Sequence, residues 1–431
     1  MSFRTPGKVA YINARLLDPA SGLDAKGNLI TDGETIAATG AGVSAPADAE
    51  IIDCKGACLA PGLVDMRVQL REPGEEHKET LASAGEAAVA GGVTTMVCLP
   101  NTDPVIDDIA AVEFVARIAR KNGLAKVYPY AAATKGLEGK ELAEIGMLAE
   151  AGALGFTDGT KAIANALMMR RALSYAATFG LLIVQHPEEP SLAGGVMNEG
   201  ELSTRLGLSG ISNAAEAIML ERDIRLLAGT GARYHAAHVS TAEGVELIRQ
   251  AKKRGLKITC DTAPPYFALN ELAVGDYRTF SKLSPPLRSE DDRLAIVEGL
   301  KDGTIDAIAS DHAPQDQDGK RLPFAQAEFG GVGLETLLQV SLELFHNEQM
   351  SLLQVIDRLT LSPARLLGLK AGTLTKGAPA DLVIFNPDRA GKVNPARFRS
   401  KSKNSPFDGR PVQGRVLRTV VDGRSVFTAD D

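Results

Sequence analysis

Several residue types that define specialised classes of protein are rare or missing in this sequence. It has no tryptophan, an aromatic content of 5% and only four cysteines in 431 residues, and no two of these cysteines form a CxxC pair. This usage argues against a disulfide scaffold and indicates buried or incidental thiols in a reducing compartment. The cysteines are Cys54, Cys58, Cys98 and Cys260.

Long hydrophobic runs and an excess of basic residues are missing as well. The N-terminal segment holds no apolar stretch of the signal-peptide type, and no apolar run approaches the length that crosses a bilayer. The net charge of −7 argues against a nucleic-acid-binding surface, although the local charge around a small anionic substrate can oppose it. We therefore expect a cytoplasmic protein that binds neither membrane nor nucleic acid.

Both ends of the chain are rich in short strand-like runs. Residues 8–57 alternate apolar runs with Gly and Asp turns, and residues 372–427 show the same alternation. Neither end is large enough to bury a core alone. We predict that residues 1–57 and 371–431 combine into one small β-sandwich beside a separate middle part.

The middle part, residues 58–370, has a different pattern, in which eight strand-like runs alternate with helix-length amphipathic stretches. Eight such alternations predict an α/β protein with a parallel (β/α)₈ TIM-like barrel. A doubly wound open sheet is the alternative, which the number of runs disfavours. The runs lie at 58–70, 94–100, 126–133, 153–158, 181–187, 233–240, 257–264 and 305–314.

Polar residues end most of these runs, and in such a barrel the chemistry lies at the C-terminal ends of the strands. A lone histidine there is usually structural, and Asp before Gly usually makes a turn. Two imidazoles and carboxylates together, however, are ligands that suit zinc, so the pattern predicts a metal site or the remnant of one. The four residues are Asp158, His186, His238 and Asp311, and the other polar residues at strand ends are Arg67, Gln69, Arg71 and Asn101.

Two further histidines are weaker candidates. His235 and His238 are three positions apart in one run, so they would point to opposite sides of a strand. We therefore expect His235 to pack outside the barrel. His312 follows Asp311 directly and should face away from it.

Six fragments, taken together in their order, resemble the class I dihydroorotases of the amidohydrolase superfamily. The resemblance implies a zinc enzyme of pyrimidine biosynthesis, in which zinc-bound hydroxide opens the ring of dihydroorotate to N-carbamoyl-L-aspartate, reversibly. The fragments are PGLVDMRVQLREPG (61–74), LPNTDPVID (99–107), AHVST (237–241), SPPLRSEDDR (284–293), SDHAP (310–314) and SKSKNSPF (400–407).

The resemblance implies a role for each predicted metal ligand. Asp158 is similar to the carboxylate that bridges two zinc ions, and His186 and His238 are similar to the histidines of the second zinc. Asp311 is similar to the aspartate that binds the first zinc and moves the proton to and from the ring nitrogen.

The substrate side of the family site is only partly present. Arg71 and Asn101 resemble the residues that clamp the substrate carboxylate. In contrast, Gln315 and Ser284 replace a histidine and an asparagine that contact the substrate in that family. These changes put recognition of dihydroorotate in doubt.

The first strand departs furthest from the family pattern. Arg67 and Gln69 occupy the positions of its His-x-His pair and share a face of the strand. Arginine keeps its proton and has no lone pair for a metal, so the first zinc site loses two ligands and gains a fixed positive charge. That charge should pair with Asp158 or Asp311, and we expect at most one zinc ion, or none.

Three hypotheses follow. The first is a dihydroorotase-like subunit with weak or lost catalysis that assembles with aspartate carbamoyltransferase and forms a homodimer, as the resemblance implies. The second is an active cyclic amidase that uses one zinc ion, held by three or four of the predicted ligands. The third is a scaffold protein without a ligand.

Overall fold

The computed structural model describes residues 7–430, and its central part is a closed ring of parallel strands. Phe156 joins two groups of strands through parallel bridges to Ala131 and Ile183, and a bridge between Val68 and His312 closes the ring. The predicted barrel is therefore confirmed, with Phe156 as its fourth strand. The other strands are β6 (Leu63–Val68), β7 (Val93–Cys98), β8 (Lys126–Pro129), β9 (Leu182–Gln185), β12 (Arg233–Ala236), β13 (Ile258–Thr262) and β14 (Ala307–Ile308).

The run expected to form the first barrel strand, 58–70, is divided in the structure. Its first part is β5 (Cys58–Pro61), which pairs with β1 and β15 in a separate sheet built from the two ends of the chain. The barrel begins only at β6. Gly62 marks the division, because a Cβ there would lie 2.2 Å from the side chain of Thr94. Both strands are buried on both faces, so the sequence shows one continuous apolar run.

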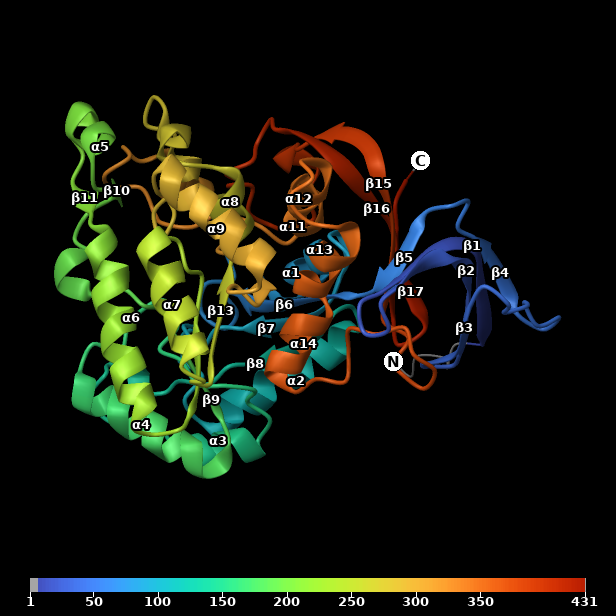
Figure 1. Cartoon of the computed structure of the whole chain (residues 1–431), viewed down its shortest axis with the longest axis horizontal. Helices are drawn as coiled ribbons and strands as arrows, with labels where there is room; N and C mark the ends of the chain where they lie inside the picture. The colour runs from blue at the N-terminus through green and yellow to red at the C-terminus, as the bar shows by residue number, and fades with distance from the viewer. Residues whose placement is uncertain (1–6, 431) are drawn as a thin grey trace.

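Strands from both termini form one eight-stranded sheet in the order β17-β16-β15-β5-β1-β2-β3, with β4 paired to β1. The sheet encloses an apolar cluster of its own, which includes Tyr11, Leu29 and Leu382. Figure 1 shows its blue and red strands together at one side of the barrel. Its strands are β1 (Lys8–Asp18), β2 (Leu23–Asp32), β3 (Thr35–Gly40), β4 (Glu50–Asp53), β15 (Leu382–Lys392), β16 (Pro411–Val421) and β17 (Arg424–Thr428).

Helices surround the barrel, and polar caps fix where several of them begin and end. Asp108 caps α2 by accepting a hydrogen bond from the Ala111 amide, and Gly123 ends this helix in the left-handed conformation. Thr241 and Ser289 cap α7 and α9 in the same manner. The main helices are α1 (Leu81–Ala90), α2 (Ile109–Asn122), α4 (Ala166–Phe179), α6 (Asn213–Ala228), α7 (Ala242–Lys253), α9 (Glu290–Asp302), α13 (Leu352–Leu359) and α14 (Leu361–Leu367).

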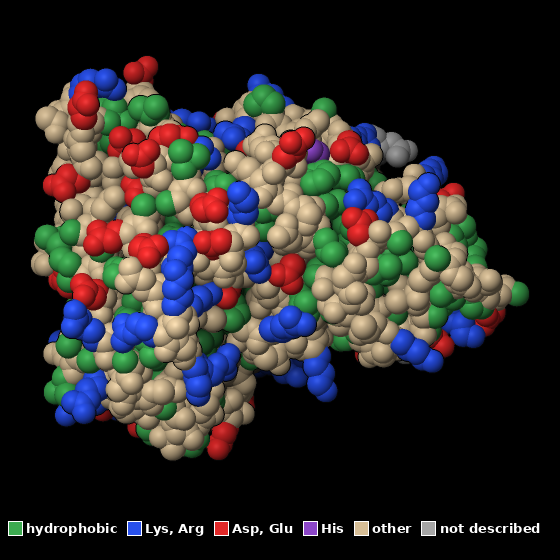
Figure 2. Space-filling model, viewed as in Figure 1, with side chains coloured by type: hydrophobic (Ala, Val, Ile, Leu, Met, Phe, Trp, Pro, Cys, Tyr) green, Lys and Arg blue, Asp and Glu red, His purple; other side chains and the backbone are tan. Residues whose placement is uncertain are grey.

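Shorter elements complete the chain and leave a mixed surface. Figure 2 shows acidic and basic side chains interspersed over the barrel helices on the face in view. Within residues 7–430, every helix is too short or too polar to cross a membrane. The short elements are α3 (Ile145–Glu150), α5 (Glu201–Leu206), α8 (Pro264–Ala268), α10 (Gln317–Arg321), α11 (Leu337–Ser341), α12 (Glu343–His346), β10 (Met197–Asn198) and β11 (Gly210–Ile211).

Candidate functional site

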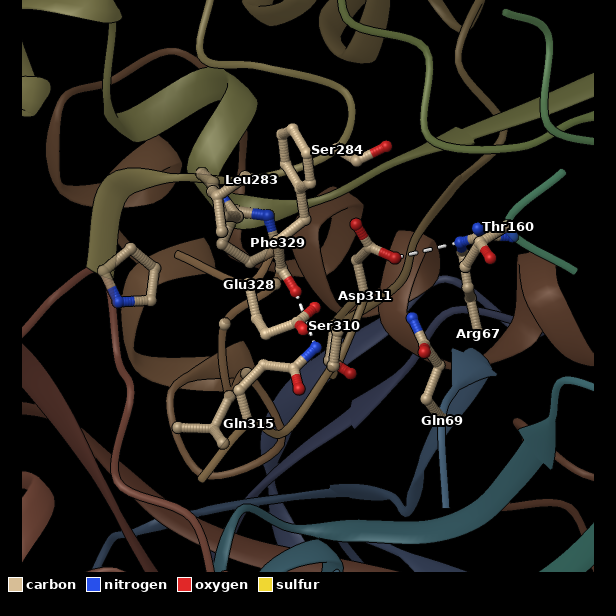
Figure 3. Close-up of a pocket in the computed structure, with 18 of the residues that line it drawn as sticks. Arg67, Gln69, Thr160, Leu283, Ser284, Ser310, Asp311, Gln315, Glu328 and Phe329 are labelled. Carbon is tan, nitrogen blue, oxygen red and sulfur yellow. Dashed lines mark hydrogen bonds and ion pairs between the residues drawn. The ribbon is translucent and has the colours of Figure 1, made fainter. Parts of the chain in front are cut away.

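A pocket of about 310 Å³ opens at the C-terminal ends of the barrel strands. Residues at the ends of β6, β7 and β14 form its floor, and the C-terminal segment contributes Pro406 and Phe407 to its wall. Figure 3 shows Arg67 and Gln69 on one side of this pocket, with Asp311 opposite Arg67. The barrel therefore brings the predicted strand-one and strand-eight residues together.

The Arg67 guanidinium occupies the floor of the pocket. Its Nε donates to Asp311 Oδ1 at 2.9 Å, and the Arg67 side chain is only 2% exposed. Its Nη2 lies 3.5 Å from the Gly159 carbonyl oxygen, and Nη1 is buried with no hydrogen-bond partner among the described residues. An unpartnered buried donor costs about 1–3 kcal/mol. Loss of Asp311 would in addition leave the guanidinium as an uncompensated buried charge.

A chain of hydrogen bonds extends from Asp311 across the mouth of the barrel. Asp311 Oδ2 lies 3.1 Å from His238 Nδ1, and His238 Nε2 lies 2.8 Å from His186 Nδ1. His186 Nε2 lies 3.3 Å from Glu188 Oε2. The Tyr266 hydroxyl lies 3.4 Å from Asp311 Oδ2, so both oxygens of this carboxylate are engaged.

The contact between the two imidazole rings needs a proton on one of the facing nitrogens and a lone pair on the other. With His238 Nε2 and His186 Nδ1 2.8 Å apart, one is the donor and one the acceptor, in roles that we infer from the network.

The pKa values of the central pair move in the same direction, for different reasons. Burial alone would raise the pKa of Asp311, but His238 and Arg67 overcome this and hold it well below its usual range. Burial, reinforced by the Arg67 charge, lowers the pKa of His238 to about 4. Near neutral pH, Asp311 is therefore ionised and His238 is neutral.

Asp158 points away from this network. Its Oδ1 accepts from the Thr134 amide at 2.9 Å, and its Oδ2 accepts from Thr134 Oγ1 at 2.5 Å. Burial nevertheless raises the pKa of Asp158. Of the two carboxylates expected to pair with Arg67, only Asp311 forms an ion pair with it in the structure.

The residues expected to bind a substrate carboxylate lie on the same pocket wall. Asn101 Nδ2 donates to Gln69 Oε1 at 3.1 Å. Arg71 Nε donates to the Pro314 carbonyl at 3.2 Å, and its Nη1 donates to Glu75 at 2.8 Å. The Nη2 group of Arg71 has no hydrogen-bond partner within residues 7–430, and this side chain lines the pocket. Among these residues, the Arg71 guanidinium therefore keeps one donor group without a partner.

Sequence reasoning placed His235 wrongly. The Tyr234 hydroxyl donates to Asp223 of α6, so Tyr234 faces the helices and His235 faces the barrel interior. There, His235 Nδ1 lies 2.8 Å from Thr259 Oγ1 and its Nε2 lies 3.5 Å from Asp261 Oδ2. The alternation fails because β12 ends at Ala236, two residues before His238.

The backbone at three site residues adopts a conformation that side chains rarely occupy. Arg71, His238 and Asp311 have φ values of 61°, 40° and 49°. Such residues cost of order 1 kcal/mol or more each, and they cluster where a side chain must be held in one direction. The Asp261 carboxylate accepts from the His238 amide and so helps to hold that backbone.

Sequence reasoning missed two partners of the predicted ligands, Glu188 and Thr134. The only signal for Glu188 was its place two residues after His186 in the HPEE run. Thr134 gave no signal, because its contact with Asp158 joins residues 24 positions apart. A carboxylate or hydroxyl beside a candidate ligand is recognised only once the fold is known.

The arrangement does not fit a metal ion. Within residues 7–430, no group of three or more His, Cys, Asp or Glu side chains is placed to hold one. Hydrogen bonds engage Asp158 with Thr134 and the two imidazoles with each other, and the Arg67 charge opposes a second cation. The metal role of Asp158, His186, His238 and Asp311 stays a prediction.

Comparisons with known proteins agree with the motifs. Residues 56–244 match the family model described as dihydro-orotase-like, and residues 229–427 match the amidohydrolase family. A protein named dihydroorotase from Anaplasma phagocytophilum is 48% identical over 429 residues, which cover 98% of this chain and 96% of that protein. The chain belongs to the dihydroorotase family. This confirms the resemblance that the sequence fragments indicated.

A second relative supports the same assignment, and two solved structures show the same fold. A dihydroorotase from Syntrophus aciditrophicus is 45% identical over 98% of this chain and 100% of that protein. The structure of an L-hydantoinase from Arthrobacter aurescens superposes with a TM-score of 0.87 at 27% identity, and covers 97% of this chain and 96% of that one. A dihydropyrimidinase from Brevibacillus agri, at 22% identity over 98% of this chain and 95% of that one, shares the fold with a TM-score of 0.83.

The buried ion pair can be tested by stability. We expect Arg67→Met or Asp311→Asn alone to lower the free energy of unfolding by about 3–5 kcal/mol, because each leaves an uncompensated buried charge or polar group. The double variant should lose clearly less than the sum of the two. Chemical denaturation of the four proteins measures this coupling.

The exposed pair Arg15–Asp24 provides a matched control, with Nε–Oδ1 at 2.7 Å and side chains 39% and 35% exposed. The cycle Arg15→Met with Asp24→Asn should give a coupling below about 1 kcal/mol. If both cycles gave the same coupling, Arg67 would not hold Asp311 as described.

Proposed function

We propose that this chain is a dihydroorotase-family subunit of pyrimidine biosynthesis whose own catalysis is weak or lost. The observation that carries the proposal is the Arg67–Asp311 ion pair, with Nε 2.9 Å from Oδ1 in the pocket floor. The family reaction needs a free carboxylate to move a proton and a nucleophile activated beside it. In this chain the Arg67 guanidinium binds the carboxylate and takes the place beside it.

The state of Asp311 supports this proposal. A general base acts best when its pKa lies near the working pH, and the pKa of Asp311 lies well below its usual range. Its Oδ1 is bound to Arg67, and its Oδ2 faces His238 and Tyr266. A substrate proton would therefore meet a weak base whose oxygens already have partners.

The pocket still has the chemistry of an anion-binding site. Arg71 presents a free Nη2 donor, and Asn101 lies on the same wall. We propose that a small carboxylate of the dihydroorotate or N-carbamoyl-aspartate class binds there without efficient turnover. Gln315 and Ser284, which also line the pocket, make this binding weaker or differently selective than in the active family.

The proposal includes a protein partner. Family resemblance supports an assembly with aspartate carbamoyltransferase, a homodimeric state and a cytoplasmic location. A subunit whose chemistry is lost keeps a role if it organises the enzyme that makes its ligand.

The second candidate is an active cyclic amidase with one zinc ion. What favours it is that the His186 and His238 rings face each other, with Nδ1 and Nε2 2.8 Å apart. An imidazole pair with one or two carboxylates is a zinc ligand set of the usual kind. Such an ion would have to displace the proton that the rings share, against the charge of Arg67.

Metal content and turnover separate the two candidates. For protein purified without added metal, we expect far less than one zinc per chain and ring opening slower than in a metal-containing family enzyme by roughly 10³-fold or more. Elemental analysis and a dihydroorotate assay measure both. About one zinc per chain, with activity that a chelator removes, would favour the amidase instead.

Restoring imidazoles to strand one tests the assignment of Arg67 and Gln69. We expect Arg67→His with Gln69→His to raise the zinc content toward two ions per chain, because the change removes a fixed charge and adds two ligands. Arg170→His with Arg171→His, on exposed positions of α4, is the control and should leave the zinc content unchanged. Equal zinc contents in both variants would contradict the assignment.

Co-elution tests the partner. We expect the chain to elute with the aspartate carbamoyltransferase of its own organism in size-exclusion chromatography, as a complex larger than either protein alone. Arg67→His with Gln69→His should not change this elution, because both residues lie inside the pocket. Separate elution of the two proteins at every ratio would refute the partner and leave the ligand proposal standing.

A further inference from the structure

A second hollow, of about 390 Å³, lies where the terminal sheet meets the barrel. Its walls come from the end of β15, the start of β16 and the end of β17, with Gln339 of α11 on the barrel side. It shares no lining residue with the barrel pocket. The two pockets are therefore separate sites.

Basic side chains converge on this hollow. Five line it, against two acidic residues, although the whole chain carries a net charge of −7. One acidic residue, Glu335, is occupied: its Oε1 accepts from the Arg399 and Ser400 amides, at 2.7 and 3.0 Å. The other is Asp430. The basic residues are Arg389, Lys392, Arg397, Arg399 and Arg415.

Within the described residues, none of these five cations forms an ion pair, and the side chains of four form no hydrogen bond either. Within the described part of the chain, the side chains of Arg389, Lys392, Arg397 and Arg399 make no ion pair, whereas Arg410 nearby is paired with Glu343 at 2.8 Å. Arg415 donates only to the Asp430 carbonyl. Unpaired cations around one concavity repel each other, so a polyanion that enters relieves this repulsion and gains several charge-assisted hydrogen bonds.

The lining of the hollow is mostly polar but has an apolar part. Val393, Val412 and Val416, which are nearly buried in the core, and the half-buried rings of Phe398 and Phe427 form it. These five residues are the apolar floor of the hollow. A hollow of a few hundred Å³ with an apolar floor and converging polar groups has the form of a small-molecule site. A flat ring can lie on such a floor while charged groups reach the rim.

We propose that this hollow binds a nucleoside di- or triphosphate, with the phosphates on the four unpaired cations and the base against the apolar floor. Inorganic phosphate satisfies the cations but leaves the floor uncovered, and an apolar ligand does the reverse. A nucleotide is the common ligand class that matches both parts. Because the site lies away from the barrel pocket, its occupant would act on assembly or on the barrel rather than as a substrate.

Calorimetric titration of the full chain with ATP, UTP and inorganic triphosphate, at physiological salt, tests the proposal. We expect at least one nucleotide to bind about tenfold or more tightly than inorganic triphosphate, because only the nucleotide covers the floor. Equal affinity for nucleotide and triphosphate, or no binding of either nucleotide, would overturn the proposal.

Two variants locate the site. Arg389→Ala with Arg397→Ala should weaken nucleotide binding by tenfold or more, because two of the four cations that hold the phosphates are lost. Arg170→Ala with Arg171→Ala removes the same charge from exposed positions of α4 and should leave binding unchanged. Equal weakening in both variants would assign the effect to overall charge and overturn the site. Zinc content and ring opening are measured separately, so failure here does not affect the function proposed for the barrel.

Discussion

The ion pair between Arg67 and Asp311 is the interaction on which the rest of the site depends. A guanidinium buried at 2% exposure must be neutralised locally, and Asp311 is the carboxylate in reach. Once Asp311 is charged, it orients His238, which in turn orients His186 toward Glu188. The site is therefore a self-contained network of protein groups.

Much of the fold followed from the sequence because barrel strands are buried on both faces and read as apolar runs. The predictions failed where the pattern and the pairing differ. The run at 153–158 contributes one bridging residue, Phe156, and the run at 58–70 belongs to two sheets. A strand's length and its partner depend on neighbours distant in sequence, which composition does not record.

At the site, strand periodicity placed Arg67 and Gln69 together in the pocket, and strand-end logic brought Asp311 opposite them. The same periodicity misplaced His235, because it assumes a regular strand as far as His238, where the φ value is 40°. Thr134 and Glu188 were beyond reach, since their contacts depend on loop geometry. Residue identity thus predicted which side chains come together in the pocket, whereas the orientation of each side chain depends on the local backbone conformation.

The wall contributed by residues 404–407 has a consequence for synthesis. Asn404 Oδ1 accepts a hydrogen bond from the backbone N–H of Gln315, and Asn404 Nδ2 donates to the Gly330 carbonyl. Pro406 and Phe407 line the barrel pocket. A chain leaving the ribosome can form most of its barrel early, since domains fold from the N-terminus onward. Its cavity stays without one wall until nearly the last residues emerge, so a truncated product would hold a formed barrel with an incomplete mouth.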